Sequence, residues 1–244
     1  MRIAALVLTV ALVTSACASI RPRDRGDVVR AVMASTVQLR TEREGGARRA
    51  GSGVVLFTEA STSWILTTRH LLEPSVSQTV SVVSATRPRR RVRAAVTALS
   101  AESDLALLRV EGLALPGVRL KDTVRLGDPV WVVAFPWGRR STIVSGVVSQ
   151  LTSDAGDASD APVEGAASMV DASVSYGASG GGVFDAETGA LVALVESHRT
   201  ARVALPDARD RTLEVPVPGE TTVIPVPVIL RFIATTPLAA SLTR

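Results

Sequence analysis

The feature that most constrains this chain is a series of short, valine-rich segments separated by turn residues. In the first of them, which begins at Thr36, Val37 and Leu39 alternate with Gln38 and Arg40. Such strict alternation is typical of a half-buried β-strand. Aromatic residues make up only 3% of the 244 residues, so Val, Leu, Ala and Ile must build most of the core. Further segments predict strands in the same way: 51–56, 63–68, 79–83, 92–98, 105–110, 129–134, 141–151, 182–184 and 191–196.

Short strands at short spacing predict an all-β barrel or sandwich, because no strand–helix–strand alternation is present. Asp27 is a candidate N-cap for a short helix that ends near Ala34. A closing helix is predicted over 227–234, with proline in its first turn. The proline-containing stretch 203–222 predicts a long hairpin or insertion, and 152–167 predicts an exposed loop.

Residues 1–18 have the pattern of an export signal. Arg2 is followed by the apolar stretch 3–13 and by small residues up to Cys17. The polar stretch 19–27 then predicts a short tether. Export predicts a location in the periplasm or cell envelope.

Cys17 is the only cysteine, which excludes an internal disulfide and a cysteine-based metal site. The string Thr14-Ser15-Ala16-Cys17 resembles a bacterial lipobox, in which the cysteine is lipidated and becomes the mature N-terminus. Ordinary cleavage, for example after Ala18, is the alternative. A lipidated Cys17 would tether the protein to a membrane surface.

The basic character of the chain does not by itself predict nucleic-acid binding. The net charge is +4 and the pI about 10.4, but the basic residues are almost all scattered arginines. The one cluster, Arg87 to Arg93, reads as a solvated turn and strand rim. No zinc-finger or RNA-binding signature accompanies it, so we expect no nucleic-acid partner.

Three residues could act as a general base. His70 and His198 are the only histidines, and histidine most often does this work near neutral pH. Lys121, the only lysine, lies beside Asp122 and away from any glycine-rich turn. A serine–lysine pair is therefore disfavoured.

The best candidate nucleophile is Ser179, in the string Gly177-Ala178-Ser179-Gly180-Gly181-Gly182. A reactive serine needs an exposed position on a tight turn, with backbone N–H groups free to hold an oxyanion. Glycines allow such a turn and leave space for a substrate backbone. The N–H groups of Gly177 and Ser179 are the predicted oxyanion hole.

Several motifs in one order resemble the trypsin-like serine protease superfamily, nearest its bacterial Deg/HtrA branch. The resemblance covers about residues 30–235. The string 177–182 is similar to the family's Gly-Asn-Ser-Gly-Gly-Pro motif, 67–72 to Thr-Asn-Ala-His-Val-Val and 104–108 to Asp-Leu-Ala-Val-Leu. Supporting matches are 51–53 before the histidine, and 126–128 with 144–149 at the start of the second barrel.

The resemblance implies a fold of two six-stranded antiparallel β-barrels of the chymotrypsin type with a short C-terminal helix. It places the protease domain at 28–240, with the first barrel at about 30–118, the second at about 119–225 and the helix at about 227–236. No PDZ domain is expected after it. The oligomeric state is left open.

The resemblance also implies a Ser-His-Asp triad, with Ser179 as nucleophile, His70 as base and Asp104 as the acid that orients it. The expected activity is hydrolysis of exported or misfolded polypeptides through an acyl-enzyme, without metal or cofactor. The alternative is a weakly active or inactive protease-like binding module. Three departures from the family pattern bear on this choice: Arg69, Ala178 and Gly182.

Four residues are predicted to form the specificity pocket: Ser173, Val195, Glu196 and His198. Ser173 lies six places before Ser179, where the family often sets the character of the pocket. A small neutral residue there disfavours a preference for Arg or Lys and favours small or medium apolar side chains.

Overall fold

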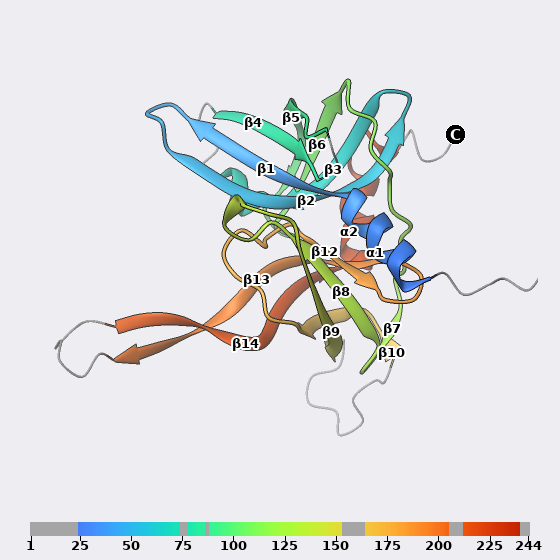
Figure 1. Cartoon of the computed structure of the whole chain (residues 1–244), viewed down its shortest axis with the longest axis vertical. Coiled ribbons are helices and arrows are strands. Elements are labelled where there is room, and N and C mark those ends of the chain that lie inside the picture. The colour runs from blue at the N-terminus through green and yellow to red at the C-terminus, as the bar shows by residue number, and fades with distance from the viewer. Residues whose placement is uncertain (1–23, 74–77, 86–87, 153–163, 205–211, 240–244) are drawn as a thin grey trace, which may run out of the picture.

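The fold is a pair of closed β-barrels placed one above the other (Figure 1). The computed structural model describes residues 24–73, 78–85, 88–152, 164–204 and 212–239. The predicted export signal, Cys17 and most of the predicted tether therefore lie outside the described residues. Both barrels are antiparallel and six-stranded, which confirms the fold class expected from the sequence.

The first barrel has the strand order β1-β2-β3-β6-β5-β4. A short 3₁₀ helix, η1 (Arg69–Leu72), follows its third strand and carries His70. Its strands are β1 (Thr36–Arg43), β2 (Arg48–Glu59), β3 (Thr62–Thr68), β4 (Gln78–Ser84), β5 (Arg91–Ser100) and β6 (Leu105–Glu111).

The second barrel has the order β11-β14-β13-β12-β8-β9. A second 3₁₀ helix, η2 (Pro136–Gly138), connects β8 to β9. Outside the barrel, β7 (Val124–Arg125) and β10 (Glu164–Gly165) form a separate two-stranded sheet. The barrel strands are β8 (Pro129–Ala134), β9 (Thr142–Leu151), β11 (Ala167–Asp171), β12 (Gly182–Asp185), β13 (Leu191–Ala204) and β14 (Thr212–Pro225).

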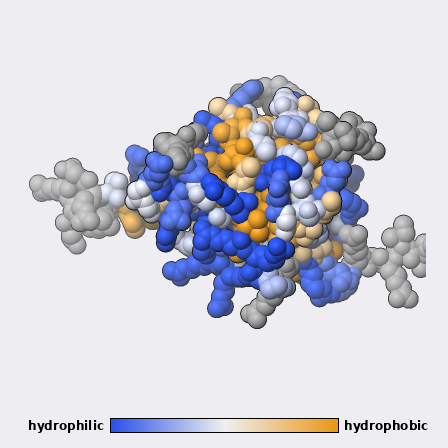
Figure 2. Space-filling model, turned by 90° about the horizontal axis from the view of Figure 1, so that it is seen from above, coloured by the Kyte–Doolittle hydropathy of each residue, from blue (hydrophilic) through white to orange (hydrophobic). Residues whose placement is uncertain are grey.

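Each barrel encloses its own apolar core, and a third core lies between them. Val54, Leu66 and Leu107 of the first barrel pack in one cluster with Phe184 and Leu194 of the second. Two helices complete this cluster: α1 (Arg25–Ala34) and α2 (Val226–Ala234). The shared core holds together the two halves whose loops form the candidate site. In the view from above, hydrophilic residues cover much of the surface, and apolar residues are exposed between them (Figure 2).

The predicted start of the first helix was wrong by three residues, because the N-cap is Asp24 and not Asp27. The helix begins at Arg25, so the last three residues of the predicted tether form its first turn, and the backbone C=O of Asp24 accepts hydrogen bonds from Asp27 and Val28. Tertiary contacts favour this longer helix. The guanidinium of Arg25 lies 4.5 Å from the ring centre of Trp131, and Val28 is buried in the shared core.

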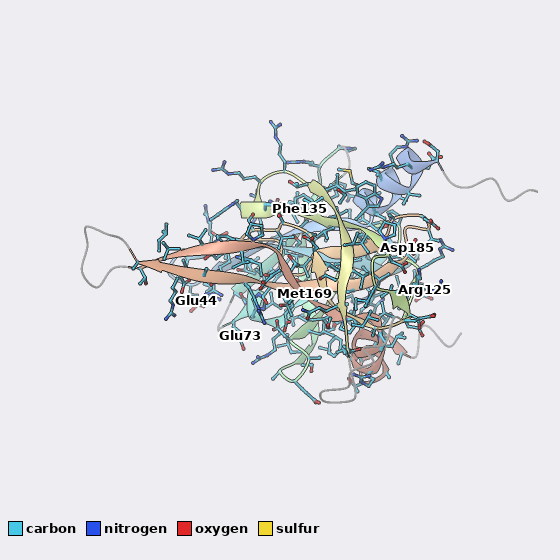
Figure 3. All side chains as sticks on the ribbon, turned by 90° about the horizontal axis from the view of Figure 1, so that it is seen from below. Glu44, Glu73, Arg125, Phe135, Met169 and Asp185 are labelled. Atoms are coloured by element: carbon cyan, nitrogen blue, oxygen red, sulfur yellow. The ribbon has the colours of Figure 1, made fainter. Side chains whose placement is uncertain are left out.

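Two other sequence predictions meet different outcomes. A hairpin is confirmed, but the bounds expected for it, 203–222, were wrong. β13 and β14 pair from Ala193 with Pro225 to Ala204 with Thr212, so most of the first strand precedes residue 203, and the hairpin extends away from the barrel (Figures 1 and 3). The loop expected over 152–167 was wrong at its end. Glu164 and Gly165 form β10, and Ala167 opens β11, because their backbones pair with β7 and β9.

Among the described residues, no helix is both long and apolar enough to cross a membrane.

We expect the shared core to dominate the free energy of unfolding. Ile229 on α2 is fully buried in it, whereas its neighbour Leu230 is 42% exposed. Ile229→Ala should lower the free energy of unfolding by about 2–5 kcal/mol, through lost burial and the cavity left behind. Leu230→Ala, measured by urea denaturation beside it, should change this free energy by less than about 0.5 kcal/mol. Similar losses for both variants would contradict the packing described for α2.

Candidate active site

His70 and Asp104 meet at the edge of the first barrel. Asp104 ends the turn between β5 and β6 in the left-handed conformation, with φ 51°, a conformation that Asp tolerates better than most residues. One of its carboxylate oxygens lies 2.6 Å from the Nδ1 atom of His70, and the other accepts the backbone N–H of His70 at 2.9 Å. The backbone C=O of Asp104 accepts the N–H of Arg69 at 2.8 Å. The carboxylate therefore fixes both the ring and the backbone of the histidine.

The surroundings raise the pKa of His70 above its ordinary value of 6.5. The main cause is the hydrogen bond to Asp104, because a carboxylate acceptor stabilises the imidazolium. Burial acts in the opposite direction. The negative charges of Asp104, Glu196 and Glu73 add to the rise.

Arg69, which departs from the family pattern beside the histidine, has a charged partner of its own. Its guanidinium pairs at 2.5 Å with the carboxylate of Glu73, the residue that directly follows η1. Arg49 also supports this segment, since its guanidinium donates to the backbone C=O of Glu73 at 3.1 Å and of His70 at 3.4 Å. The charged side chain at position 69 thus links the start of the 3₁₀ helix to the residue that follows it.

In the loop that carries Ser179, some backbone N–H groups are hydrogen-bonded and two are not. Ala178, Gly180 and Gly181 donate their N–H groups to backbone oxygens at 2.8–3.0 Å. Within the described residues, no hydrogen bond takes up the N–H of Gly177 or of Ser179. These are the two positions that the sequence analysis assigns to the oxyanion hole.

The peptide bond before Gly177 is held in one orientation. The C=O of Tyr176 accepts the N–H of Trp137 at 2.7 Å. Because C=O and N–H point in opposite directions across a trans peptide, this bond turns the N–H of Gly177 away from η2. Gly177 has φ 89°, and a Cβ atom there would lie 2.8 Å from the backbone nitrogen of Trp137. Only glycine meets both conditions without strain.

Ser52, at the centre of β2, joins this loop to the first barrel. It is fully buried. Its N–H donates to the C=O of Ser179 at 3.0 Å, and its hydroxyl donates to the C=O of Gly177 at 2.8 Å. The same hydroxyl accepts the N–H of Phe135 at 2.8 Å. One serine of the first barrel thus holds the candidate nucleophile loop and the segment that enters η2.

The same strand also touches the histidine segment. A Cβ atom at Gly51 would lie 2.6 Å from the side chain of Leu71, the residue after His70. A Cβ atom at Gly180 would lie 2.2 Å from the C=O of Ser52. The dipeptide Gly51-Ser52 therefore lies between η1 and the Ser179 loop, close against both.

Gly182, a second departure from the family pattern, has a packing cause. A Cβ atom there would lie 2.3 Å from the ring of Phe184, which fills the core between the barrels. Any larger residue at position 182 would displace this ring. Ala178, the third departure, is buried in the core of the second barrel.

Glu196 occupies a bulge of β13 beside the His70–Asp104 pair. Val195 pairs with Val223 and Ser197 with Thr222, which leaves Glu196 as an extra residue in the strand. Bulges of this kind redirect a side chain and are frequent next to active sites. The pKa of Glu196 is raised from 4.5, first by burial and then by the negative charge of Asp104, while His70 acts in the opposite direction.

The other predicted pocket residues lie at different depths. His198 is half-buried, and its ring meets the edge of the Tyr176 ring at 5.3 Å between centres. Tyr176 in turn lies 5.1 Å from Trp137, so the three rings form a row beside Gly177. Val195 is buried in the second barrel, with its backbone bonded to Gly180 and Gly181. Ser173 is exposed.

Lys121 has a structural partner away from these loops. Its ammonium lies 2.6 Å from the Asp185 carboxylate, which also accepts the N–H groups of Glu187 and Thr188. Figure 3 shows Asp185 on the side of the molecule away from the β13–β14 hairpin. Among the described residues, no three His, Cys, Asp or Glu side chains are grouped as metal ligands.

Sequence reasoning missed three residues that shape the site: Ser52, Arg49 and Trp137. Ser52 stands between two glycines in the motif Gly51-Ser52-Gly53, and this polar residue inside a buried strand is the signal that could have identified it. Arg49 and Trp137 act through contacts across the fold, to the backbone of η1 and of the Ser179 loop. No local pattern marks these two.

Comparison with known proteins agrees with this geometry. Residues 51–194 match the family model "Trypsin-like peptidase domain". A Pseudomonas putida protein named "Probable periplasmic serine endoprotease DegP-like" is 30% identical over 112 residues, or 45% of this chain and 22% of that protein. A Haemophilus influenzae protein named "Probable periplasmic serine protease do/HhoA-like" is 30% identical over 145 residues, or 58% and 29%. The chain thus spans less than a third of the length of these curated relatives.

Solved structures share the fold at lower sequence identity. An HtrA-type protease, AlgW, with a tripeptide has a TM-score of 0.61 and 21% identity, covering 85% of this chain and 62% of that one. A serine endoprotease from Yersinia pestis has a TM-score of 0.62 and 20% identity, covering 86% and 65%.

Fold and loops together define a two-barrel protein of the chymotrypsin type. The chain belongs to the trypsin-like peptidase domain family, and the expected resemblance to its Deg/HtrA branch is confirmed.

We expect Ser52 to stabilise the fold through its hydroxyl. Ser52→Ala leaves the N–H of Phe135 and the C=O of Gly177 without their partner, which should cost about 1–3 kcal/mol in the free energy of unfolding. Ser81→Ala is the matched control, because Ser81 is also buried in the first barrel and its hydroxyl has no hydrogen bond within the described residues. Chemical denaturation of both variants measures the difference, and equal losses would refute the role given to Ser52.

Proposed function

We propose that the protein is a serine endopeptidase with Ser179 as nucleophile, His70 as base and Asp104 as orienting acid. The observation that carries the proposal is the 2.6 Å contact between His70 Nδ1 and the Asp104 carboxylate. With its Nδ1–H donated to Asp104, the ring keeps Nε2 as a proton acceptor. The family membership and the two free N–H groups of the Ser179 loop support the same assignment.

The proposed reaction is acyl transfer in two steps. His70 takes the proton from the Ser179 hydroxyl as its oxygen attacks the scissile carbonyl, and the C=O electron pair moves to the oxyanion. The N–H groups of Gly177 and Ser179 stabilise this oxyanion. His70 then gives the proton to the leaving amine, and an acyl-enzyme forms. Water repeats the sequence with His70 as base and releases the second product.

The proposed substrates are exported or misfolded polypeptides. The names of the two relatives describe periplasmic serine proteases, which supports export to the periplasm for this chain as well. Lipidation of Cys17, and hence a membrane tether, stays a prediction from the sequence. A preference for small or medium apolar side chains beside Ser173, Val195, Glu196 and His198 stays one too.

A fluorophosphonate probe tests the nucleophile directly. The wild-type protein should become covalently labelled, because the probe reacts only with an activated serine. Ser179→Ala should abolish labelling, and His70→Ala should reduce turnover of an unfolded protein substrate by roughly 10⁴-fold or more. His198→Ala should keep most of the activity, since no hydrogen bond or ion pair of the described residues joins its side chain to His70, Asp104 or Ser179, and its ring contacts Tyr176 instead. Folded wild type that takes up no label would instead support an inactive binding module.

The raised pKa of His70 predicts a shifted pH profile. The base must be neutral to accept a proton, so kcat/KM should rise with pH through a value above 6.5. Glu196→Gln removes a negative charge that raises the pKa of His70, and should therefore move this rise to lower pH. Profiles of kcat/KM for both proteins against one peptide measure the shift. A rise at unchanged or higher pH in the variant would contradict the influence of Glu196.

A further inference from the structure

We propose that an arginine-lined pocket beside the candidate active site binds an acidic side chain of the polypeptide substrate, within a few residues of the scissile bond. This inference rests on the proposed peptidase function and adds a substrate preference to it. The pocket has a volume of about 310 Å³ and is lined by four arginines, Arg40, Arg48, Arg49 and Arg91, with Glu42 and the η2 residues Trp137 and Gly138.

Two of the residues that line the pocket contact the segments that carry the proposed chemistry. The Arg49 guanidinium donates to the backbone C=O of His70. Trp137 donates its N–H to Tyr176, the residue before Gly177. The C=O of Gly138 accepts a hydrogen bond from the side-chain amide of Gln38 in β1, which fixes η2 against the first barrel. A chain bound across the Ser179 loop would therefore reach the pocket within a few residues, at about 3.3 Å per extended residue.

The charges of the pocket are unbalanced. Among its lining residues, Glu42 is the only carboxylate against four guanidinium groups, which leaves three positive charges in excess. Glu42 lies 2.8 Å from Arg48 and 4.0 Å from Arg91, and its pKa is lowered by the hydrogen bond from Arg48. The carboxylate is therefore ionised at neutral pH and already counted in this balance. The excess is available to a ligand.

The shape and chemistry fit a carboxylate on a short apolar stem. A guanidinium presents paired N–H donors that match the two oxygens of a carboxylate. Trp137 adds an exposed ring at the pocket wall, with 63% of its surface accessible, against which methylene groups can pack. Asp and Glu side chains combine these two properties, and Glu reaches further. Arg91 belongs to the basic cluster Arg87 to Arg93, which the sequence analysis placed on a solvated rim. In this proposal, Arg91 has a role in substrate binding.

One double variant tests the pocket, and a single variant on the same strand as Arg91 serves as control. Arg48→Gln and Arg91→Gln together reduce the excess from three positive charges to one, without touching Arg49, which supports His70. Arg93→Gln removes one positive charge from an exposed position two residues further along β5 than Arg91, where the side chain lines a different cavity with Arg109 and Glu111.

The first measurement is cleavage of a peptide library by the wild-type protein, followed by kcat/KM for a matched pair of peptides with Glu or Gln at the selected position. We expect Asp and Glu to be enriched at one position near the cleaved bond. The Glu peptide should lose roughly fivefold or more in kcat/KM in the double variant, and the Gln peptide should change little. High ionic strength should weaken the preference. Arg93→Gln should behave as wild type.

A second measurement separates this inference from the peptidase proposal. Binding of the same two peptides to Ser179→Ala, followed by fluorescence anisotropy, does not need turnover. Tighter binding of the Glu peptide that is lost in the double variant supports the pocket even if the wild type cleaves nothing. Cleavage or binding without any preference for the acidic peptide overturns the pocket and leaves the peptidase proposal intact. An equal loss in Arg93→Gln also overturns it, because the effect would then reflect net charge alone.

Discussion

The hydrogen bonds of Ser52 are the constraint on which the candidate site depends. Its hydroxyl and N–H reach two carbonyls of the Ser179 loop, in the other barrel, and the same hydroxyl accepts the N–H of Phe135. Because Ser52 is fully buried, each of these groups would be costly to leave unpaired. The Ser179 loop is therefore held in one position relative to the strand that packs against the histidine segment. Two segments distant in sequence are thereby held against one strand, although no hydrogen bond of the described residues joins them directly.

Much of the fold could be predicted because apolar residues in the sequence mark the positions that the strands bury. The strand expected over 129–134 is β8 residue for residue, since it is bounded by turn residues on both sides. The strands that were missed, or whose bounds were wrong, lack this signal. β11 is five residues long with an irregular register, and β14 contains prolines that obscure its alternation. The start of α1 depended on a contact between Arg25 and Trp131, more than a hundred residues away, which no local pattern records.

The candidate site divides in the same manner. Groups that would do chemistry stand in motifs, because a reactive serine needs glycines beside it and an imidazole needs a nearby carboxylate. Groups that hold those motifs in place do not, since Arg49 and Trp137 act through backbone carbonyls that any sequence provides. Arg69 and Gly182 show the converse case. Each departs from the family pattern, and each departure is explained by one contact. Arg69 pairs with Glu73, and Gly182 leaves space for the ring of Phe184. The sequence alone does not show that these residues are in contact.

The electrostatic field of the site is asymmetric, and this asymmetry limits what can bind. Asp104 and Glu196 place negative charge beside His70, which raises the pKa of the ring. The same charges would repel an acidic side chain placed next to the imidazole. Four arginines gather instead around the pocket that Trp137 also lines, where the positive charge is in excess. At distances within about 8–10 Å, salt screens such opposed fields only in part. An acidic residue of a bound chain is then favoured in one register, on the arginine side, and a shift of the chain toward His70 would bring it into the repulsive part of the field.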